Sequence, residues 1–182
     1  FIVFADADLD VAVPGVAWAR LLNAGQVCTS PKRIYLLRPI AEEFTRRLLA
    51  YLKTLTVGDP MDPTTDVGPL ISEHALATVE RQIAEAVKEG ATLAAGGRRI
   101  SPAGLAGHFL EPTVLTGVKH GALPTREEIF GPIATVVKAA DAEEALALAN
   151  DTEFGLSAGV CTTSLKHAAR FGDPVRGRLG VI

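Results

Sequence analysis

Residues 33–55 read RIYLLRPIAEEFTRRLLAYLKTL, and this stretch indicates how the chain folds. Its first five residues, Arg33–Leu37, form a short β-branched and aromatic run that is typical of a buried strand. After Pro39 the apolar residues recur at helical spacing, at Ile40, Phe44, Leu48, Tyr51, Leu52 and Leu55. The stretch therefore predicts a strand followed by an amphipathic helix.

The same alternation continues on both sides of this stretch. Apolar spacing and capping residues predict helices over 9–23, 73–89, 142–150 and 164–171. Strands are predicted over 92–95, 113–115, 133–138, 156–162 and 179–182. We therefore expect an α/β fold: a three-layer αβα arrangement with a mostly parallel sheet, in one domain over residues 1–182.

The predicted helix over 9–23 has clear start and stop signals. Asp8 or Asp10 can cap its first turn, and Pro14 is expected in or near that turn, where a missing N–H costs least. Asn23, Ala24 and Gly25 are expected to end the helix, with Gly25 in the left-handed conformation.

The composition argues against several classes of protein. The 182 residues carry 18 Lys and Arg against 21 Asp and Glu, a formal net charge of −3, so nothing favours a nucleic-acid partner. We expect no membrane association, because no apolar run approaches the roughly 18 residues of a spanning helix. Two cysteines are too few for a disulfide scaffold, so we expect free thiols and a cytoplasmic protein.

Cys28 is the first candidate for a functional residue. It lies in GQVCTSPKR, residues 25–33, between a helix end and a buried strand. A loop there would hold the thiol at the sheet edge, where ligands gather if it is the carboxyl edge of the strands. Thiol chemistry needs the thiolate, which Lys32 or Arg33 would favour. The alternative is a small buried apolar residue, the usual role of a free cysteine.

The second candidate is the turn REEIFGP, residues 126–132, which directly precedes a predicted strand. A carboxylate there can accept two hydrogen bonds from a diol such as a ribose, and the neighbouring aromatic Phe130 can line a flat ring. The alternative is a solvated acidic turn with Phe130 anchored in the core.

The remaining chemistry-bearing residues form no recognisable site. Cys161 falls inside a predicted central strand and is expected in the core. The four histidines are scattered without metal-ligand spacing, and a cysteine–histidine hydrolase stays open because such partners meet in space. Neither a phosphate-binding G-x-x-x-x-G-K-[ST] loop nor a G-x-G-x-x-G motif occurs.

Taken together and in order, five segments of the chain resemble the aldehyde dehydrogenase superfamily. They are FIVFADADLDVAV (1–13), NAGQVCTSPKRIYL (23–36), LTVGDPMDPTTDVGPLIS (55–72), REEIFGPIATV (126–136) and NDTEFGLSAGVCT (150–162). The second segment resembles the family's cysteine signature. The resemblance covers the whole chain and implies the fold of the thiol-bearing catalytic domain.

The resemblance implies a role for three residues. Cys28 would be the nucleophile that attacks the aldehyde carbon to give a thiohemiacetal, which passes hydride to NAD or NADP. A thioester to Cys28 would remain, and water would hydrolyse it. The backbone N–H of Cys28 would donate to the developing oxyanion. Glu128 would hold the nicotinamide ribose, and Phe130 would pack near the nicotinamide. No metal ligand is implied.

The family's other parts are expected to lie outside this chain, which starts at Phe rather than Met. These are the dinucleotide-binding domain, the general-base glutamate, the asparagine that is the second oxyanion donor, and the C-terminal motifs with the oligomerisation tail. We therefore expect little dehydrogenase turnover from this chain alone. The alternatives are a non-catalytic module or association surface, with a homo-oligomer among its forms, and residual thiol-based ester hydrolysis.

Overall fold

A six-stranded sheet forms the centre of the computed structural model, which describes residues 1–102 and 104–172. The strand order is β3-β6-β7-β2-β1-β8, and every neighbouring pair is parallel except β3 with β6. The strands are β1 (Ile2–Val3), β2 (Arg33–Leu37), β3 (Thr92–Ala95), β6 (Thr113–Thr116), β7 (Ile133–Ala139) and β8 (Val160–Cys161). The mostly parallel sheet predicted from the alternation is thus confirmed.

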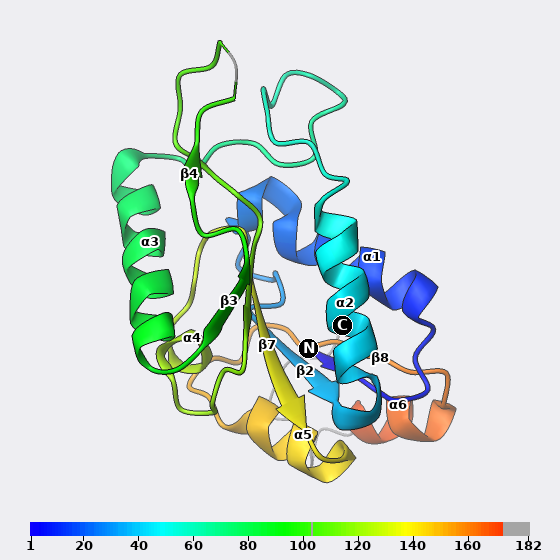
Figure 1. Cartoon of the computed structure of the whole chain (residues 1–182). Helices are drawn as coiled ribbons and strands as arrows, with labels where there is room; N and C mark the ends of the chain where they lie inside the picture. Colours follow the sequence, from blue (N-terminus) through cyan, green and yellow to red (C-terminus); the bar gives the residue numbers. More distant parts are fainter. Residues whose placement is uncertain (103, 173–182) are drawn as a thin grey trace.

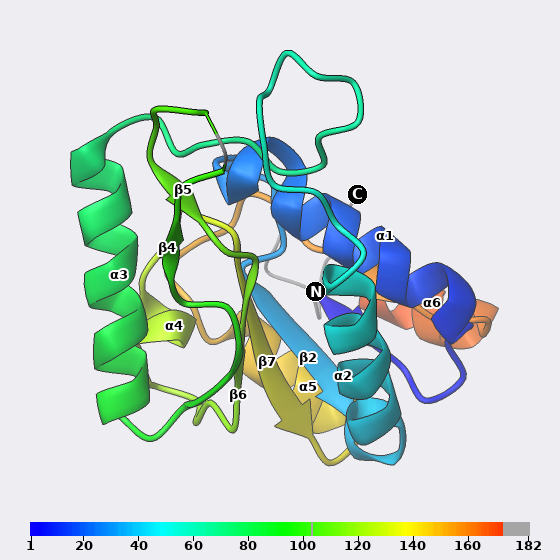
Figure 2. The same ribbon diagram turned by 45° about the horizontal axis from the view of Figure 1, so that its top comes forward.

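Helices cover both faces of this sheet (Figures 1 and 2). On one face α1 (Leu9–Leu21) and α2 (Arg38–Leu52) pack on each other and on β2 and β7. On the other face α5 (Ala142–Asn150) packs on β1, β2 and β7, and α6 (Leu165–Phe171) lies near β1. In Figure 1, α3 (Glu73–Lys88) lies on the side of the molecule where β3 ends the sheet.

Side-chain caps begin four of these helices, because they satisfy N–H groups that have no partner within the helix. Asp8, Ser72, Asp141 and Ser164 each accept a hydrogen bond from a backbone N–H two or three residues later. The capping signals therefore place helix starts within one residue of where the structure has them.

Several short elements differ from prediction. Pro14 lies inside α1 beyond the first turn. The short helix α4 (Leu123–Arg126) and the two-stranded ladder of β4 (Arg99–Ile100) and β5 (Phe109–Leu110) were not predicted. The strand predicted over 156–162 is shortened to β8, which pairs with β1, while Leu156, Ser157 and Ala158 before it line a cavity. The strand predicted over 179–182 lies outside the described residues.

The core fills the space between sheet and helices. The middle strands β2 and β7 are buried along almost their whole length, as expected for parallel strands covered on both faces. Phe44 and Leu48 of α2 are fully buried against them. This core fixes the position of the strand ends, from which the site described below is built.

Candidate functional site

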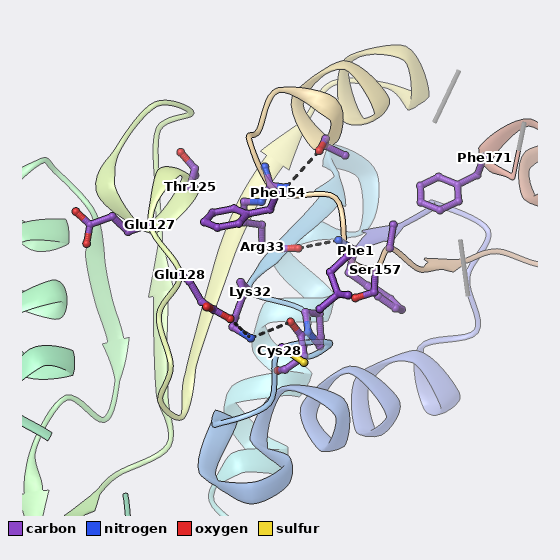
Figure 3. A pocket seen from close by; sticks show the side chains of 15 residues that line it. Phe1, Cys28, Lys32, Arg33, Thr125, Glu127, Glu128, Phe154, Ser157 and Phe171 are labelled. Atoms are coloured by element: carbon purple, nitrogen blue, oxygen red, sulfur yellow. Dashed lines mark hydrogen bonds and ion pairs between the residues drawn. The ribbon is translucent and has the colours of Figure 1, made fainter. Parts of the chain in front are cut away.

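Four loop segments meet at a cavity of about 190 Å³, and each of them directly precedes a parallel strand. Phe1 precedes β1, residues 28–32 precede β2, residues 125–128 lead into β7, and residues 154–158 lead into β8. The cavity is therefore at the amino ends of the strands (Figure 3). The condition that ligands gather at the carboxyl edge is not met here, because the loops that line the cavity come before the strands.

Cys28 lies in the loop between α1 and β2, and its side chain is exposed and lines the cavity. Its backbone N–H makes no hydrogen bond within the described part of the chain. Figure 3 shows the sulfur in the same close-up as Lys32 and Glu128. The alternative of a small buried apolar residue is therefore wrong for Cys28.

The acidic turn brings Glu128 to the same cavity. The Oε1 atom of Glu128 lies 3.3 Å from the Lys32 ammonium nitrogen, and the carboxylate is 42% exposed. Phe130 is 43% exposed, whereas its neighbour Ile129 is buried at 2%. Ile129 and not Phe130 therefore anchors the turn in the core, and the alternative of Phe130 as a core anchor is wrong. Phe130 is not part of the cavity lining.

Lys32 connects the two halves of the site. Its ammonium donates to the backbone carbonyl of Val27, pairs with Glu128 and lies 5.3 Å from the centre of the Phe130 ring. Burial and the nearby charge of Arg20 lower the pKa of Lys32, while Glu128 and Cys28 oppose this shift. Lys32 is thus a half-buried cation at the junction of the thiol loop and the acidic turn.

Arg20 of α1 is the residue that sequence reasoning missed. Its fully buried guanidinium donates to Gly25 and Ser30 of the thiol loop, and to the carbonyls of Ile129, Gly131 and Ile133. Burial lowers the pKa of Arg20 to about 10, and the charge of Glu128 opposes that shift. The two segments are therefore held together by one side chain. The sequence did carry a signal that Arg20 is buried. Its helical spacing from Val13, Val16 and Ala17 places it on the buried face of α1.

Gly25 brings the same two segments into direct contact. Its φ of +74° is in the left-handed region, as predicted for the end of the helix. A β-carbon at this position would lie 2.1 Å from the carbonyl oxygen of Gly131. Glycine is thus required here both by conformation and by the close approach of the turn.

The other residues considered from the sequence lie elsewhere. Cys161 is half-buried in β8, and burial raises the pKa of its thiol. His120 lies 2.7 Å from Asp151, and His108 lies 3.2 Å from Glu73. Within residues 1–102 and 104–172 no group of three or more His, Cys, Asp or Glu could hold a metal ion. None of the helices in that part of the chain combines the length and apolarity that crossing a membrane requires.

Solved structures share this fold. A succinate-semialdehyde dehydrogenase from Burkholderia pseudomallei superposes with a TM-score of 0.92 and is 40% identical, with 100% of this chain and 36% of that chain covered. A 3,6-anhydro-L-galactose dehydrogenase superposes with a TM-score of 0.93 at 39% identity, covering 100% of this chain and 38% of the other. The fold is therefore that of a part of these larger enzymes.

Curated relatives point the same way. A probable succinate-semialdehyde dehydrogenase [NADP(+)] of Sinorhizobium fredii is 41% identical over 182 residues, which are 100% of this chain and 36% of the relative. A betaine aldehyde dehydrogenase of Rhizobium leguminosarum bv. trifolii is 41% identical over 94% of this chain and 35% of its own length. The chain thus spans about a third of the length of these relatives. The family model named "Aldehyde dehydrogenase family" matches residues 1–181, and the chain belongs to that family.

Proposed function

We propose that this chain is the thiol-bearing catalytic segment of an NAD(P)-dependent aldehyde dehydrogenase and that Cys28 is its nucleophile. The observation that carries the proposal is the exposed Cys28 thiol at a cavity that also contains Glu128. The sulfur, as thiolate, forms a bond to the aldehyde carbon and gives a thiohemiacetal. That carbon would transfer a hydride to NAD(P)+, which leaves a thioester, and water would cleave the thioester to release the acid and the free thiol.

The backbone N–H of Cys28 is proposed as an oxyanion donor in that step. It has no other acceptor among the described residues and belongs to the residue whose sulfur attacks. Donors that are fixed beforehand near the developing negative charge lower the barrier more than donors that must reorganise. The loop conformation that exposes this N–H is held by Arg20, through Gly25 and Ser30.

The residues present fit one end of a nicotinamide dinucleotide. Glu128 is exposed, and its Oε2 atom has no partner among the described residues, so it can accept hydrogen bonds from ribose hydroxyls. Phe130 offers an exposed ring beside it. When bound, the nicotinamide would accept the hydride. The names of the Sinorhizobium and Burkholderia relatives make a semialdehyde one candidate substrate, and the former names NADP(+).

The remaining parts of the catalytic apparatus are proposed to lie in segments beyond these 182 residues. The chain spans 36% of the Sinorhizobium relative, and we propose that the general base, the main dinucleotide-binding domain and the oligomerisation segment belong to the rest. Little turnover is therefore expected from this chain alone. We place the protein in the cytoplasm, a proposal supported by the two free thiols.

A second candidate role, an association surface, is favoured by one observation. Three apolar side chains on the outer side of the α1 region are exposed: Val11 at 67%, Trp18 at 65% and Leu22 at 42%. Their spacing of seven and four residues places them along one stripe. A large exposed apolar stripe favours association with another surface, a second copy among them. Sedimentation of the chain against Trp18→Ser tests this role: the substitution should lower any self-association, and equal behaviour would contradict it.

Thiol labelling tests the proposed nucleophile. The chain is treated with iodoacetamide at neutral pH, and the modification of each cysteine is followed by mass spectrometry. We expect Cys28 to react at least about tenfold faster than Cys161, because thiolate content and exposure control the rate. Preincubation with succinate semialdehyde should slow modification of Cys28 alone. Equal rates for the two cysteines, with no protection by aldehyde, would refute the proposal, and Cys28→Ala identifies the signal.

A further inference from the structure

We propose that Lys32 is a positioning residue of this site, which holds Glu128 beside the thiol loop and directs a positive charge toward Cys28. This inference rests on the proposed function of Cys28 and Glu128 and goes beyond it, because the sequence offered Lys32 or Arg33 only as a cation that favours the thiolate and gave neither a part in holding Glu128.

The contacts of Lys32 reach both segments at once. Its ammonium pairs with Glu128 at 3.3 Å and lies 5.3 Å from the ring centre of Phe130, a distance at which a cation and an aromatic face attract each other. The two residues proposed to meet the nicotinamide end of the cofactor are therefore both in contact with the same cation. Figure 3 shows Lys32 between Glu128 and the Cys28 loop.

The charges around Lys32 act on its ammonium group in opposite directions. Lys32 has an exposed side-chain fraction of 14%, and it shares the site with the buried cation Arg20. Glu128 and Cys28 are the neighbours whose charge favours the protonated form of Lys32. Burial and the charge of Arg20 both disfavour the ammonium charge of Lys32. Glu128 and Cys28 stabilise that charge.

The anchoring of Lys32 fixes the direction of its charge. The ammonium donates to the carbonyl of Val27, one residue before Cys28, and lies 3.5 Å from the carbonyl of Ser30, two residues after it. A long, flexible side chain is thereby tied to the loop that carries the sulfur. The charge consequently faces the site instead of the solvent.

Two alkylating reagents of similar size test this proposal. Iodoacetate is anionic and iodoacetamide is neutral, and with each the Cys28 thiolate forms an S–C bond while iodide leaves. The ratio of their second-order rate constants at Cys28 measures the local charge. We expect Lys32→Met to lower this ratio about threefold to tenfold and Lys32→Arg to restore most of it, as for a unit charge near the sulfur. Lys138→Met is the matched control, because Lys138 lies near the opposite end of β7 and pairs with Glu42.

A double-variant cycle with Glu128→Gln tests the positioning. In the unaltered chain Glu128→Gln should raise the ratio, because it removes a carboxylate that Lys32 holds at the cavity shared with Cys28. In the Lys32→Met background the released carboxylate turns to solvent, so Glu128→Gln should change the ratio less than half as much. Added salt should lower the ratio of the unaltered chain toward that of Lys32→Met, and this measurement needs no variant.

The outcomes separate this inference from the proposed function. An unchanged ratio in Lys32→Met, or an equal fall in Lys138→Met, would overturn the charge role of Lys32. Equal effects of Glu128→Gln in both backgrounds would overturn the positioning role. If Cys28 still reacts much faster than Cys161 in those experiments, the proposed nucleophile stands while the inference about Lys32 fails. If the preference for Cys28 is absent from the unaltered chain, the proposed function fails first.

Discussion

Cys28 and Cys161 are the same side chain in two different surroundings, and the difference shows what the fold does with a thiol. Cys28 lies exposed in a loop that precedes β2, beside the cation Lys32. Cys161 lies half-buried in the edge strand β8, where burial alone raises the pKa of its thiol. Position relative to the strand, and the charges placed around it, therefore separate a thiol suited to chemistry from one suited to packing.

The largest expected effect comes from the side chain that holds the Cys28 loop in place. Arg20→Met removes the donor from several buried carbonyls, and each unsatisfied acceptor costs roughly 1–3 kcal/mol. We expect the free energy of unfolding to fall by about 4–6 kcal/mol, measured by urea denaturation. The faster labelling of Cys28 over Cys161 should also be lost.

The matched control for this substitution is Arg46→Met. Arg46 is an exposed arginine on α2 that pairs only with Glu43 among the described residues. It should leave both the denaturation midpoint and the labelling preference unchanged. Equal losses in the two variants would mean that Arg20 has no special role in setting the thiol loop.

The second effect concerns the close contact between the thiol loop and the acidic turn. Gly25→Ala places a β-carbon 2.1 Å from the Gly131 oxygen in a backbone with positive φ. We expect a loss of about 2–4 kcal/mol of stability, since left-handed backbone strain and overpacking add. Gly90 also has a positive φ, but a β-carbon there would meet no atom within 4 Å. Gly90→Ala therefore measures the backbone strain without the close contact. A loss at Gly25 no larger than that at Gly90, measured by thermal denaturation, would contradict the contact.

The third prediction uses pH to separate the two thiols. Because burial raises the pKa of Cys161, its iodoacetamide labelling should increase only at pH values above the ordinary range of cysteine thiols. The folded state binds the Cys161 proton more tightly than the unfolded state, so its contribution to stability is present below the unfolded pKa and is lost as pH rises through the folded one. In 6 M urea, where the chain is unfolded, the labelling of Cys161 should instead increase within the ordinary pH range of cysteine thiols. A folded-state profile for Cys161 that matches the unfolded one would contradict this prediction.

The smallest effect concerns the link between the two cysteine regions. The hydroxyl of Ser157, three residues before β8, donates to the carbonyl of Thr29 at 3.2 Å. Ser157→Ala should cost about 0.5 kcal/mol, as expected for one exposed hydrogen bond. Labelling of Cys28 should rise less than twofold, and a larger rise would show that this bond restrains the thiol loop more than its exposure suggests. Ser101→Ala, in the separate 100–108 segment, is the control.

The long periodic elements could be predicted from the sequence alone. The bounds of β2, β3 and α5 agree with the predictions, because each combines a strong apolar pattern with clear end signals such as Asp141. The helix α4 has only four residues and depends on the burial of Leu123 and Pro124, which tertiary packing decides. Such short elements carry too little local signal to be predicted.

The site could be predicted only in part, for a related reason. Cys28 and Glu128 were expected together from the family resemblance, and the structure places both at one cavity. The burial of a charge at Arg20 depends on contacts between segments more than 100 residues apart, such as the hydrogen bond from Arg20 to Ile129 with a separation of 109. The amino-end location was available in the sequence, because both segments come directly before a predicted strand of a mostly parallel sheet.

The strand order has a consequence for how the protein is made. The cavity walls come from residues 1, 28–33, 125–128 and 154–158, so the cavity exists only after β8, the strand nearest the end of the described chain, has paired with β1. During synthesis the Cys28 sulfur leaves the ribosome before residues 154–158 do. Distant pairing is slow to form, so the thiol lacks these neighbours at least until residues 154–158 have been synthesised.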